Sequence, residues 1–122
     1  MSEAVERYLG HLGARDWDGL ATTLTLGAFE RVGPFCDVIT DTSAYLEYLA
    51  EVLSPMERYE IRVRRLTGAG TVAFVEIDES FVLDGTPMSF PEVLVFDLDG
   101  EGRIARVQVY LMRPGEPARS TG

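Results

Sequence analysis

The chain has 122 residues, of which 20 are acidic and 11 are basic, so its formal net charge at pH 7 is −9. This length fits a single domain, and 46% apolar residues suffice for a globular core without disulfide or metal support. The acidic surplus argues against nucleic acid and anionic membranes as partners, because both attract cationic proteins.

The content of cysteine and histidine restricts the possible sites. Cys36 is the only cysteine and His11 the only histidine, which rules out an intrachain disulfide and nearly excludes a zinc site. We therefore expect no metal and no cofactor. The acidic N-terminus lacks the apolar run of a signal peptide, and no stretch approaches the roughly 20 apolar residues of a membrane span. These features predict a cytoplasmic protein.

The first half of the chain has helical periodicity. Apolar side chains recur every three or four positions, with glycine or proline between the segments. This spacing predicts helices over residues 3–15, 16–24 and 42–53, and a short strand over residues 29–32.

The second half alternates apolar and polar residues, which is typical of strands separated by tight turns. The predicted strands cover residues 59–66, 71–83, 88–98 and 103–112. Helices followed by an antiparallel meander indicate the α+β class. We expect one domain over residues 1–112 and a free tail over residues 113–122, which contains two prolines and two glycines.

Three segments resemble the nuclear transport factor 2-like proteins, which include SnoaL-like polyketide cyclases, ketosteroid isomerases and limonene-epoxide hydrolases. They are VERYL at residues 5–9, ARDWDGL at residues 14–20 and VFDLDGEGRIARV at residues 95–107. The resemblance covers about residues 3–112. It implies a cone in which a curved antiparallel sheet wraps around the N-terminal helices and encloses an apolar pocket for a small organic ligand.

The isomerase machinery implied by this resemblance is incomplete. Tyr8 matches, by its context, the helix tyrosine that donates to the oxyanion in ketosteroid isomerases. Their general base falls in the stretch 31–34, which holds no acid, and their protonated aspartate falls near Leu94. Steroid isomerisation by those three groups is therefore not expected.

The hydrolase machinery is also broken. The Arg-x-Asp pair of the epoxide hydrolases aligns with Glu76 and Asp78, and their last-strand aspartate aligns with Val109. For the cyclases no residue-by-residue match can be carried over. The resemblance thus indicates acid/base chemistry without specifying the reaction.

The orientation of Glu76 and Asp78 is open. Strand periodicity puts them on one face, opposite the apolar side chains of residues 73–81. In one interpretation the apolar face is core and the acids face water. In the other, favoured by the hydrolase alignment, the acids point into the cone and the apolar face lies outside. Such an apolar outer face would need cover and predicts a homodimer.

Glu92 lies in an otherwise apolar strand, between Phe90 and Leu94. Burial would raise its pKa and suit it as a general acid or base, whereas a rim position would leave it an ordinary glutamate. A pair of Asp78 and Glu92 could share a proton, while Tyr8 donates to a developing oxyanion.

The candidate site combines these residues. The predicted catalytic residues are Glu92, Asp78, Glu76 and Tyr8. The predicted pocket-lining residues are His11, Trp17, Phe74, Phe90, Leu94 and Val109. A lone helical histidine such as His11 is more often a surface residue than a functional one.

Two classes of function remain open. The first is a cofactor-free isomerase, cyclase, dehydratase or hydrolase acting on an apolar oxygenated metabolite. It predicts that Glu92→Gln and Asp78→Asn each abolish turnover. The alternative is a non-catalytic ligand-binding or dimerisation module of the same fold.

Overall fold

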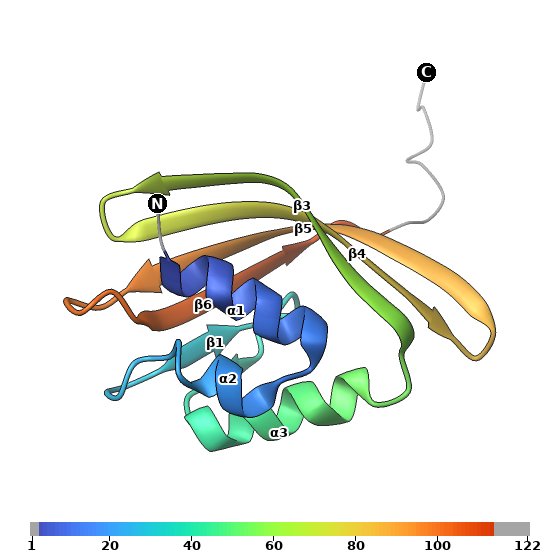
Figure 1. Ribbon diagram of the computed structural model, residues 1–122, viewed down its shortest axis with the longest axis horizontal. Helices are drawn as coiled ribbons and strands as arrows, with labels where there is room; N and C mark the ends of the chain where they lie inside the picture. Colours follow the sequence, from blue (N-terminus) through green and yellow to red (C-terminus); the bar gives the residue numbers. More distant parts are fainter. Residues whose placement is uncertain (1–2, 114–122) are drawn as a thin grey trace.

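The computed structural model describes residues 3–113, which form helices on one side of a curved sheet (Figure 1). The helices are α1 (Glu3–Ala14), α2 (Trp17–Ala21) and α3 (Thr42–Leu53). The strands are β1 (Glu30–Val32), β2 (Val38–Ile39), β3 (Glu57–Ala69), β4 (Val72–Leu83), β5 (Thr86–Leu98) and β6 (Ile104–Leu111). The predicted α+β class is confirmed, whereas the predicted tail beyond residue 113 lies outside the described residues.

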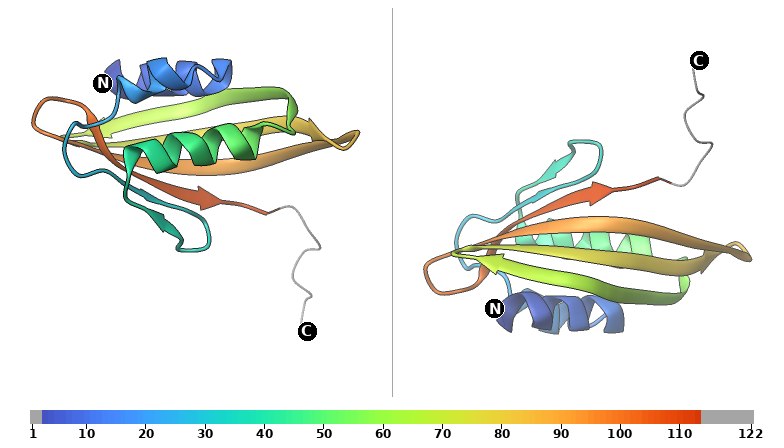
Figure 2. Two further views of the ribbon diagram at one scale, coloured as in Figure 1. Left: turned by 90° about the horizontal axis from the view of Figure 1, so that it is seen from below. Right: turned by 90° about the horizontal axis from the view of Figure 1, so that it is seen from above.

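Within the described residues the strands form a six-stranded sheet in the order β2-β1-β6-β5-β4-β3. Neighbouring strands are antiparallel except β1 and β6, which run parallel. Figure 2 shows α1 along the β3 edge and the short strands β1 and β2 at the opposite edge. Because the long strands bend around the helices, the concave face of the sheet becomes the inside of a cone.

The helices begin where the sequence provides caps. The Asp16 side chain accepts a hydrogen bond from the Gly19 backbone N–H at 3.0 Å and starts α2. The Asp41 side chain accepts one from the Ala44 N–H at 2.8 Å and starts α3. Each cap pairs a backbone donor that the first helical turn leaves without a partner. The second helix ends at Ala21, three residues earlier than predicted.

The core fills the concave side of the sheet. On β4 the buried side chains are Ala73, Val75, Ile77 and Phe81, which alternate with more exposed ones. The apolar face of this strand is therefore the inner face, and Glu76 and Asp78 lie on the outer face. This corrects the interpretation that turned the two acids into the cone. Burying the apolar face removes far more apolar area from water, whereas buried carboxylates would need partners.

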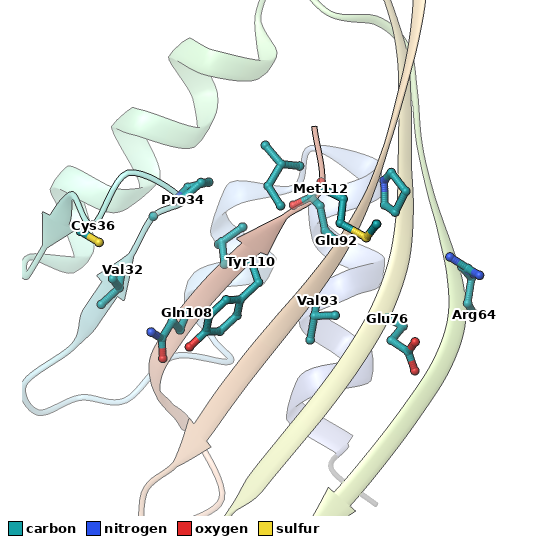
Figure 3. Close-up of a pocket in the computed structure, with 14 residues that line it drawn as sticks. Val32, Pro34, Cys36, Arg64, Glu76, Glu92, Val93, Gln108, Tyr110 and Met112 are labelled. Atoms are coloured by element: carbon teal, nitrogen blue, oxygen red, sulfur yellow. The ribbon is translucent and has the colours of Figure 1, made fainter. Parts of the chain in front are cut away.

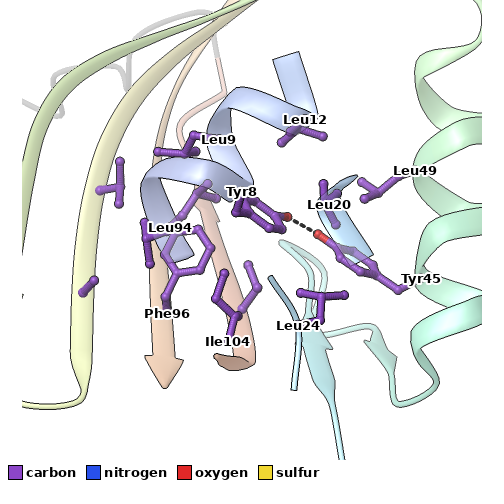
Figure 4. Packing of buried hydrophobic residues seen from close by; sticks show 14 of the residues in the cluster. Tyr8, Leu9, Leu12, Leu20, Leu24, Tyr45, Leu49, Leu94, Phe96 and Ile104 are labelled. Carbon is purple, nitrogen blue, oxygen red and sulfur yellow. Dashed lines mark hydrogen bonds between the residues drawn. The ribbon is translucent and has the colours of Figure 1, made fainter. Parts of the chain in front are cut away.

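The N-terminal helices and the C-terminal strands pack together in this core. Phe96 of β5 and Tyr8 of α1 pack edge to face with ring centroids 5.2 Å apart (Figure 4). Ile104 begins β6 at 0% exposure, beside Leu24, with which it forms an isolated bridge. No helix within residues 3–113 has both the length and the apolar character needed to cross a membrane.

Candidate functional site

A cavity of about 300 Å³ lies on the concave side of the sheet, at the small end of the range for ligand pockets. Its wall is mostly apolar and is formed by residues of α1, α3, the β1–β2 hairpin and the long strands. The polar side chains on this wall are those of Tyr8, Arg31, Asp37, Tyr45, Tyr48, Tyr59, Glu79 and Glu92. A mostly apolar wall with a few convergent polar groups is the usual architecture of a small-molecule site.

A second hollow of about 330 Å³ lies at the β6 end of the outer sheet face (Figure 3). Its wall includes Arg64, Glu76 and Tyr110, and Glu92 borders it as well as the inner cavity. Tyr110 is 52% exposed, so this hollow is open to water. In the inner cavity the polar groups Tyr8, Tyr45 and Arg31 are buried, and because water weakens charge interactions, this cavity is the better candidate for chemistry.

Glu92 is buried on the inner face of β5, with 8% of its surface exposed. Its register partners on the neighbouring strands are Ile77 and Leu111, both apolar. Its Oε2 finds no hydrogen-bond partner in the part of the chain that the structure describes. Burial, reinforced by the neighbouring Glu79 and opposed by the charge of Arg31, raises the pKa of Glu92 to about 9. Glu92 therefore carries a proton at neutral pH.

Glu79 stands beside Glu92 and was not singled out from the sequence. It lies on β4 between Ile77 and Phe81 in the inward-facing series, and it lines the cavity. The Tyr59 hydroxyl donates a hydrogen bond to Glu79 Oε2. Burial and the adjacent charge of Glu79 raise the pKa of Tyr59, so this phenol keeps its proton. The acid pair inside the cone is Glu79 and Glu92, not Asp78 and Glu92.

Two phenols meet on the helical side of the cavity. The hydroxyls of Tyr8 and Tyr45 share a hydrogen bond, and each tyrosine is 2% exposed (Figure 4). Burial, followed by the proximity of Tyr45, raises the pKa of Tyr8. Burial also raises the pKa of Tyr45, to about 12. Both hydroxyls thus keep their protons: one is donated in the hydrogen bond between them, and the other can be donated to a ligand.

Arg31 of β1 is a buried cation in the same cavity, with 6% of its surface exposed. Its Nη1 donates to Asp37 Oδ2 at 2.7 Å and its Nη2 to the Tyr48 hydroxyl at 3.2 Å. The guanidinium carbon lies 4.6 Å from the centre of the Tyr48 ring, within the range of a cation–π contact. Gly33 leaves room for the ion pair, because a Cβ there would lie 2.6 Å from Arg31 Nη1.

The predicted catalytic acids Glu76 and Asp78 lie away from this cavity. Arg65 Nε pairs with Glu76 Oε2, and Arg64 Nη1 lies 3.7 Å from Asp78 Oδ1. Both arginines belong to the adjacent strand β3, so the charges neutralise one another across the outer face. The hydrogen bond from Arg65 is the largest influence on Glu76 and lowers its pKa. Glu76 and Glu92 both border the outer hollow, but Asp78 lines neither of the two pockets, so the three acids do not converge on one site.

The predicted pocket-lining residues divide into two groups. Phe90, Leu94 and Val109 lie on the cavity wall. The other three are Phe74, His11 and Trp17, and they lie elsewhere. Phe74 is 43% exposed on the outer face of β4. The other two sit at the α1–α2 turn, where His11 Nδ1 lies 3.2 Å from Asp16 Oδ2 and Trp17 packs against the core. Turn geometry, rather than a ligand, explains this position of His11.

The described residues contain no cluster of three or more histidine, cysteine or acidic side chains that could hold a metal ion. Cys36 is exposed at the tip of the β1–β2 hairpin. The polar groups of the cavity are one arginine, the aspartate that pairs with it, several phenols and two glutamates. Such groups can donate, accept and transfer protons, and they can orient an oxygen-containing ligand.

Solved structures share this fold at low sequence identity. A protein assigned as a SnoaL-like polyketide cyclase from Shewanella putrefaciens CN-32 has a TM-score of 0.79 and 14% identity, over 89% of this chain and 87% of that chain. An LEH-like epoxide hydrolase from M. tuberculosis has a TM-score of 0.73 and 22% identity, over 89% and 80% of the two chains. These identities establish a common fold and leave the activity open.

A third neighbour contains a ligand. It is a protein of ketosteroid isomerase-like fold from Catenulispora acidiphila DSM 44928, solved in complex with trimethylamine, with a TM-score of 0.78 and 17% identity over 88% and 84% of the two chains. A comparison with curated proteins finds no match. The family model for the SnoaL-like domain matches residues 5–107, and the cone with its inner cavity is the nuclear transport factor 2-like fold. The chain therefore belongs to the SnoaL-like domain family.

Proposed function

We propose that this protein catalyses proton transfer on a small, apolar, oxygen-containing metabolite bound in the inner cavity. The observation that carries the proposal is Glu92, a buried acid with an unpartnered Oε2 within the described residues and a raised pKa. A carboxylic acid that keeps its proton at neutral pH can act as a general acid, which is a rare property for a glutamate in water.

A carbonyl ligand illustrates the proposed chemistry. Glu92 gives its proton to the carbonyl oxygen while the carboxylate of Glu79 takes a proton from the adjacent carbon, which leaves a neutral enol. Glu79 then returns its proton to a different carbon while the enol O–H returns its proton to Glu92, which completes an isomerisation and restores both side chains. The Tyr8 hydroxyl, held by Tyr45, is the proposed second hydrogen-bond donor to the carbonyl oxygen while Glu92 transfers its proton. The same transfers serve cyclisation, dehydration or epoxide opening, and none of them requires a cofactor.

Proton exchange on 2-tetralone in D2O, followed by NMR near pD 7, tests this proposal without knowledge of the natural substrate. We expect the wild-type protein to accelerate exchange of the α-protons. Glu92→Gln keeps the shape of the side chain but removes the acid, so we expect the protein-dependent rate to fall by about 10²- to 10⁴-fold.

Two matched controls are available on the outer face. Glu76→Gln and Asp78→Asn remove carboxylates that pair with Arg65 and Arg64 rather than face the cavity. We expect both variants to retain the wild-type exchange rate, in contrast to the sequence-based prediction for Asp78. Wild-type exchange in Glu92→Gln, or its loss in both controls, would contradict the assignment. Tight binding of 2-tetralone without exchange would instead support the ligand-binding alternative.

The homodimer through the outer sheet face stays a prediction. It was first based on an apolar outer face of β4, but the apolar face of this strand points inward. Phe74 and Tyr110 are exposed aromatic residues on the outer face that now favour it. They lie among paired charges, as in the rim of many interfaces. Sedimentation equilibrium at micromolar concentration checks this prediction, and a monomer throughout that range would contradict it.

A further inference from the structure

We infer that the ligand of the inner cavity carries an anionic oxygen group, such as a carboxylate, and that Arg31 binds this group. This inference rests on the proposed function, because it places the ligand in the same cavity. It narrows the ligand class to apolar oxo acids: an anionic end at Arg31, an apolar body, and a second oxygen function within reach of Glu92.

The burial of Arg31 is the first observation. A guanidinium that is 6% exposed has lost most of its hydration, so its remaining donors gain strongly from an anionic partner. It has five N–H donors, and its hydrogen bonds to Asp37 and Tyr48 do not exhaust them. The planar fork of donors also matches a carboxylate better than an ammonium group would.

The position of Arg31 at the rim is the second observation. Asp37 and Phe35 line the same cavity, yet the Asp37 side chain is 47% exposed and Phe35 is 80% exposed. The β1–β2 hairpin therefore forms the edge of the cavity, where an anionic end can stay close to water. The backbone holds Asp37 independently of Arg31, since Asp37 Oδ1 accepts from the Phe35 N–H at 3.3 Å and its carbonyl accepts from the Gly33 N–H at 2.8 Å.

The electrostatic reach of Arg31 is the third observation. Burial is the main influence on the pKa of Tyr8, Tyr45 and Glu92 and raises all three. The charge of Arg31 lowers the pKa at each of them, so its field crosses the cavity to the acid and the phenols. A ligand that spans from Arg31 to Glu92 would thus meet a cation at one end and a proton donor at the other.

Three probes of similar size test the charge preference by isothermal titration calorimetry at pH 7: phenylacetate, phenylacetamide and phenethylamine. We expect phenylacetate to bind most tightly, by about tenfold or more over the neutral amide, because a charged pair replaces a neutral hydrogen bond. Tighter binding of phenethylamine would overturn the inference and would indicate that Glu79 and Glu92 select a cation.

Variants of the ion pair give opposite expectations. Arg31→Gln is expected to weaken phenylacetate binding by about tenfold or more, and Asp37→Asn to tighten it, because Asp37 competes for the guanidinium. The control Arg65→Gln removes an arginine from the outer face and should leave the affinity unchanged. Unchanged phenylacetate affinity in both Arg31→Gln and Asp37→Asn would overturn the inference. If Arg31→Gln does not fold, the affinities of Asp37→Asn and of the wild type for the three probes decide the question.

The experiments distinguish a failure of the anion-binding inference at Arg31 from a failure of the proposed catalysis by Glu92. The probes do not react, so their affinities report on Arg31 whether or not the protein is catalytic. Phenylacetate binding that depends on Arg31 supports this inference even if 2-tetralone shows no exchange. Conversely, exchange that depends on Glu92 supports the proposed function even if the probes show no preference for an anion.

Discussion

The free energy of unfolding is expected to fall as the pH rises from 5 to 8, and Glu92→Gln is expected to remove most of this fall. The pKa of Glu92 is about 9 in the folded protein, against 4.5 for an ordinary glutamate. Between these values the folded protein binds one proton more than the unfolded chain. The free energy of unfolding therefore falls by about 1.4 kcal/mol for each unit by which the pH rises. Three units amount to at most about 4 kcal/mol.

The other shifted groups act outside this window. Asp37, Glu76 and Asp99 have lowered pKa values, so the stability they contribute is lost only as the pH falls below the ordinary range of carboxylates. The raised pKa values of Tyr8, Tyr45, Tyr59, Arg65 and Arg106 affect stability only above about pH 10. The interval from pH 5 to pH 8 therefore isolates Glu92.

Urea denaturation of the wild-type protein, Glu92→Gln and Glu76→Gln at four pH values between 5 and 8 measures this effect. Glu76→Gln is the matched control, because it removes an outer-face glutamate and should keep the wild-type slope of stability against pH. A flat wild-type curve, or equal slopes in the wild type and Glu92→Gln, would show that Glu92 does not hold its proton in the folded protein.

The sequence predicted the elements well because their periodicity is local. The helical spacing of α1 and the alternation of β4 each follow from which side chains must be buried. The cone shape of the sheet was predicted from the family resemblance. Glu79 could have been found by the same rule, since it alternates with Ile77 and Phe81 on the apolar face of β4.

Which face of β4 points inward could not be predicted from alternation alone, because a period of two defines two faces without assigning them. The distant hydrolase alignment assigned them wrongly. The sequence does contain the compensating charges, as Arg62, Arg64 and Arg65 of β3. The β3–β4 register then pairs Arg65 with Glu76 and Arg62 with Asp78, which keeps both acids on the outer face. Tertiary charge pairing of this kind has no local signature.

Arg31 was missed for a related reason. It lies in a three-residue strand, too short to show periodicity, and its burial depends on α3 and the β1–β2 hairpin. A buried arginine looks like any surface arginine in the sequence. The cation of the candidate site therefore emerges only when Tyr48, Asp37 and β1 are placed in space.

Phe96→Ala is expected to lower the free energy of unfolding by about 3–5 kcal/mol, the usual cost of removing a fully buried phenylalanine. Phe96 is 0% exposed and its register partners Ala73 and Val107 are buried as well. The deletion also removes the edge-to-face contact with Tyr8. We therefore expect Phe96→Ala to loosen Tyr8 and its hydrogen bond to Tyr45, in addition to leaving a void.

Phe74→Ala is the matched control, because it makes the same deletion on the opposite face of the sheet. Phe74 is 43% exposed, so its replacement is expected to cost less than about 1 kcal/mol. Urea denaturation at pH 6 measures both variants, and near-ultraviolet circular dichroism reports on the packing of the tyrosines. Equal costs for Phe96→Ala and Phe74→Ala would contradict the assignment of the inner and outer faces, and with it the placement of Glu92 and Glu79 inside the cone.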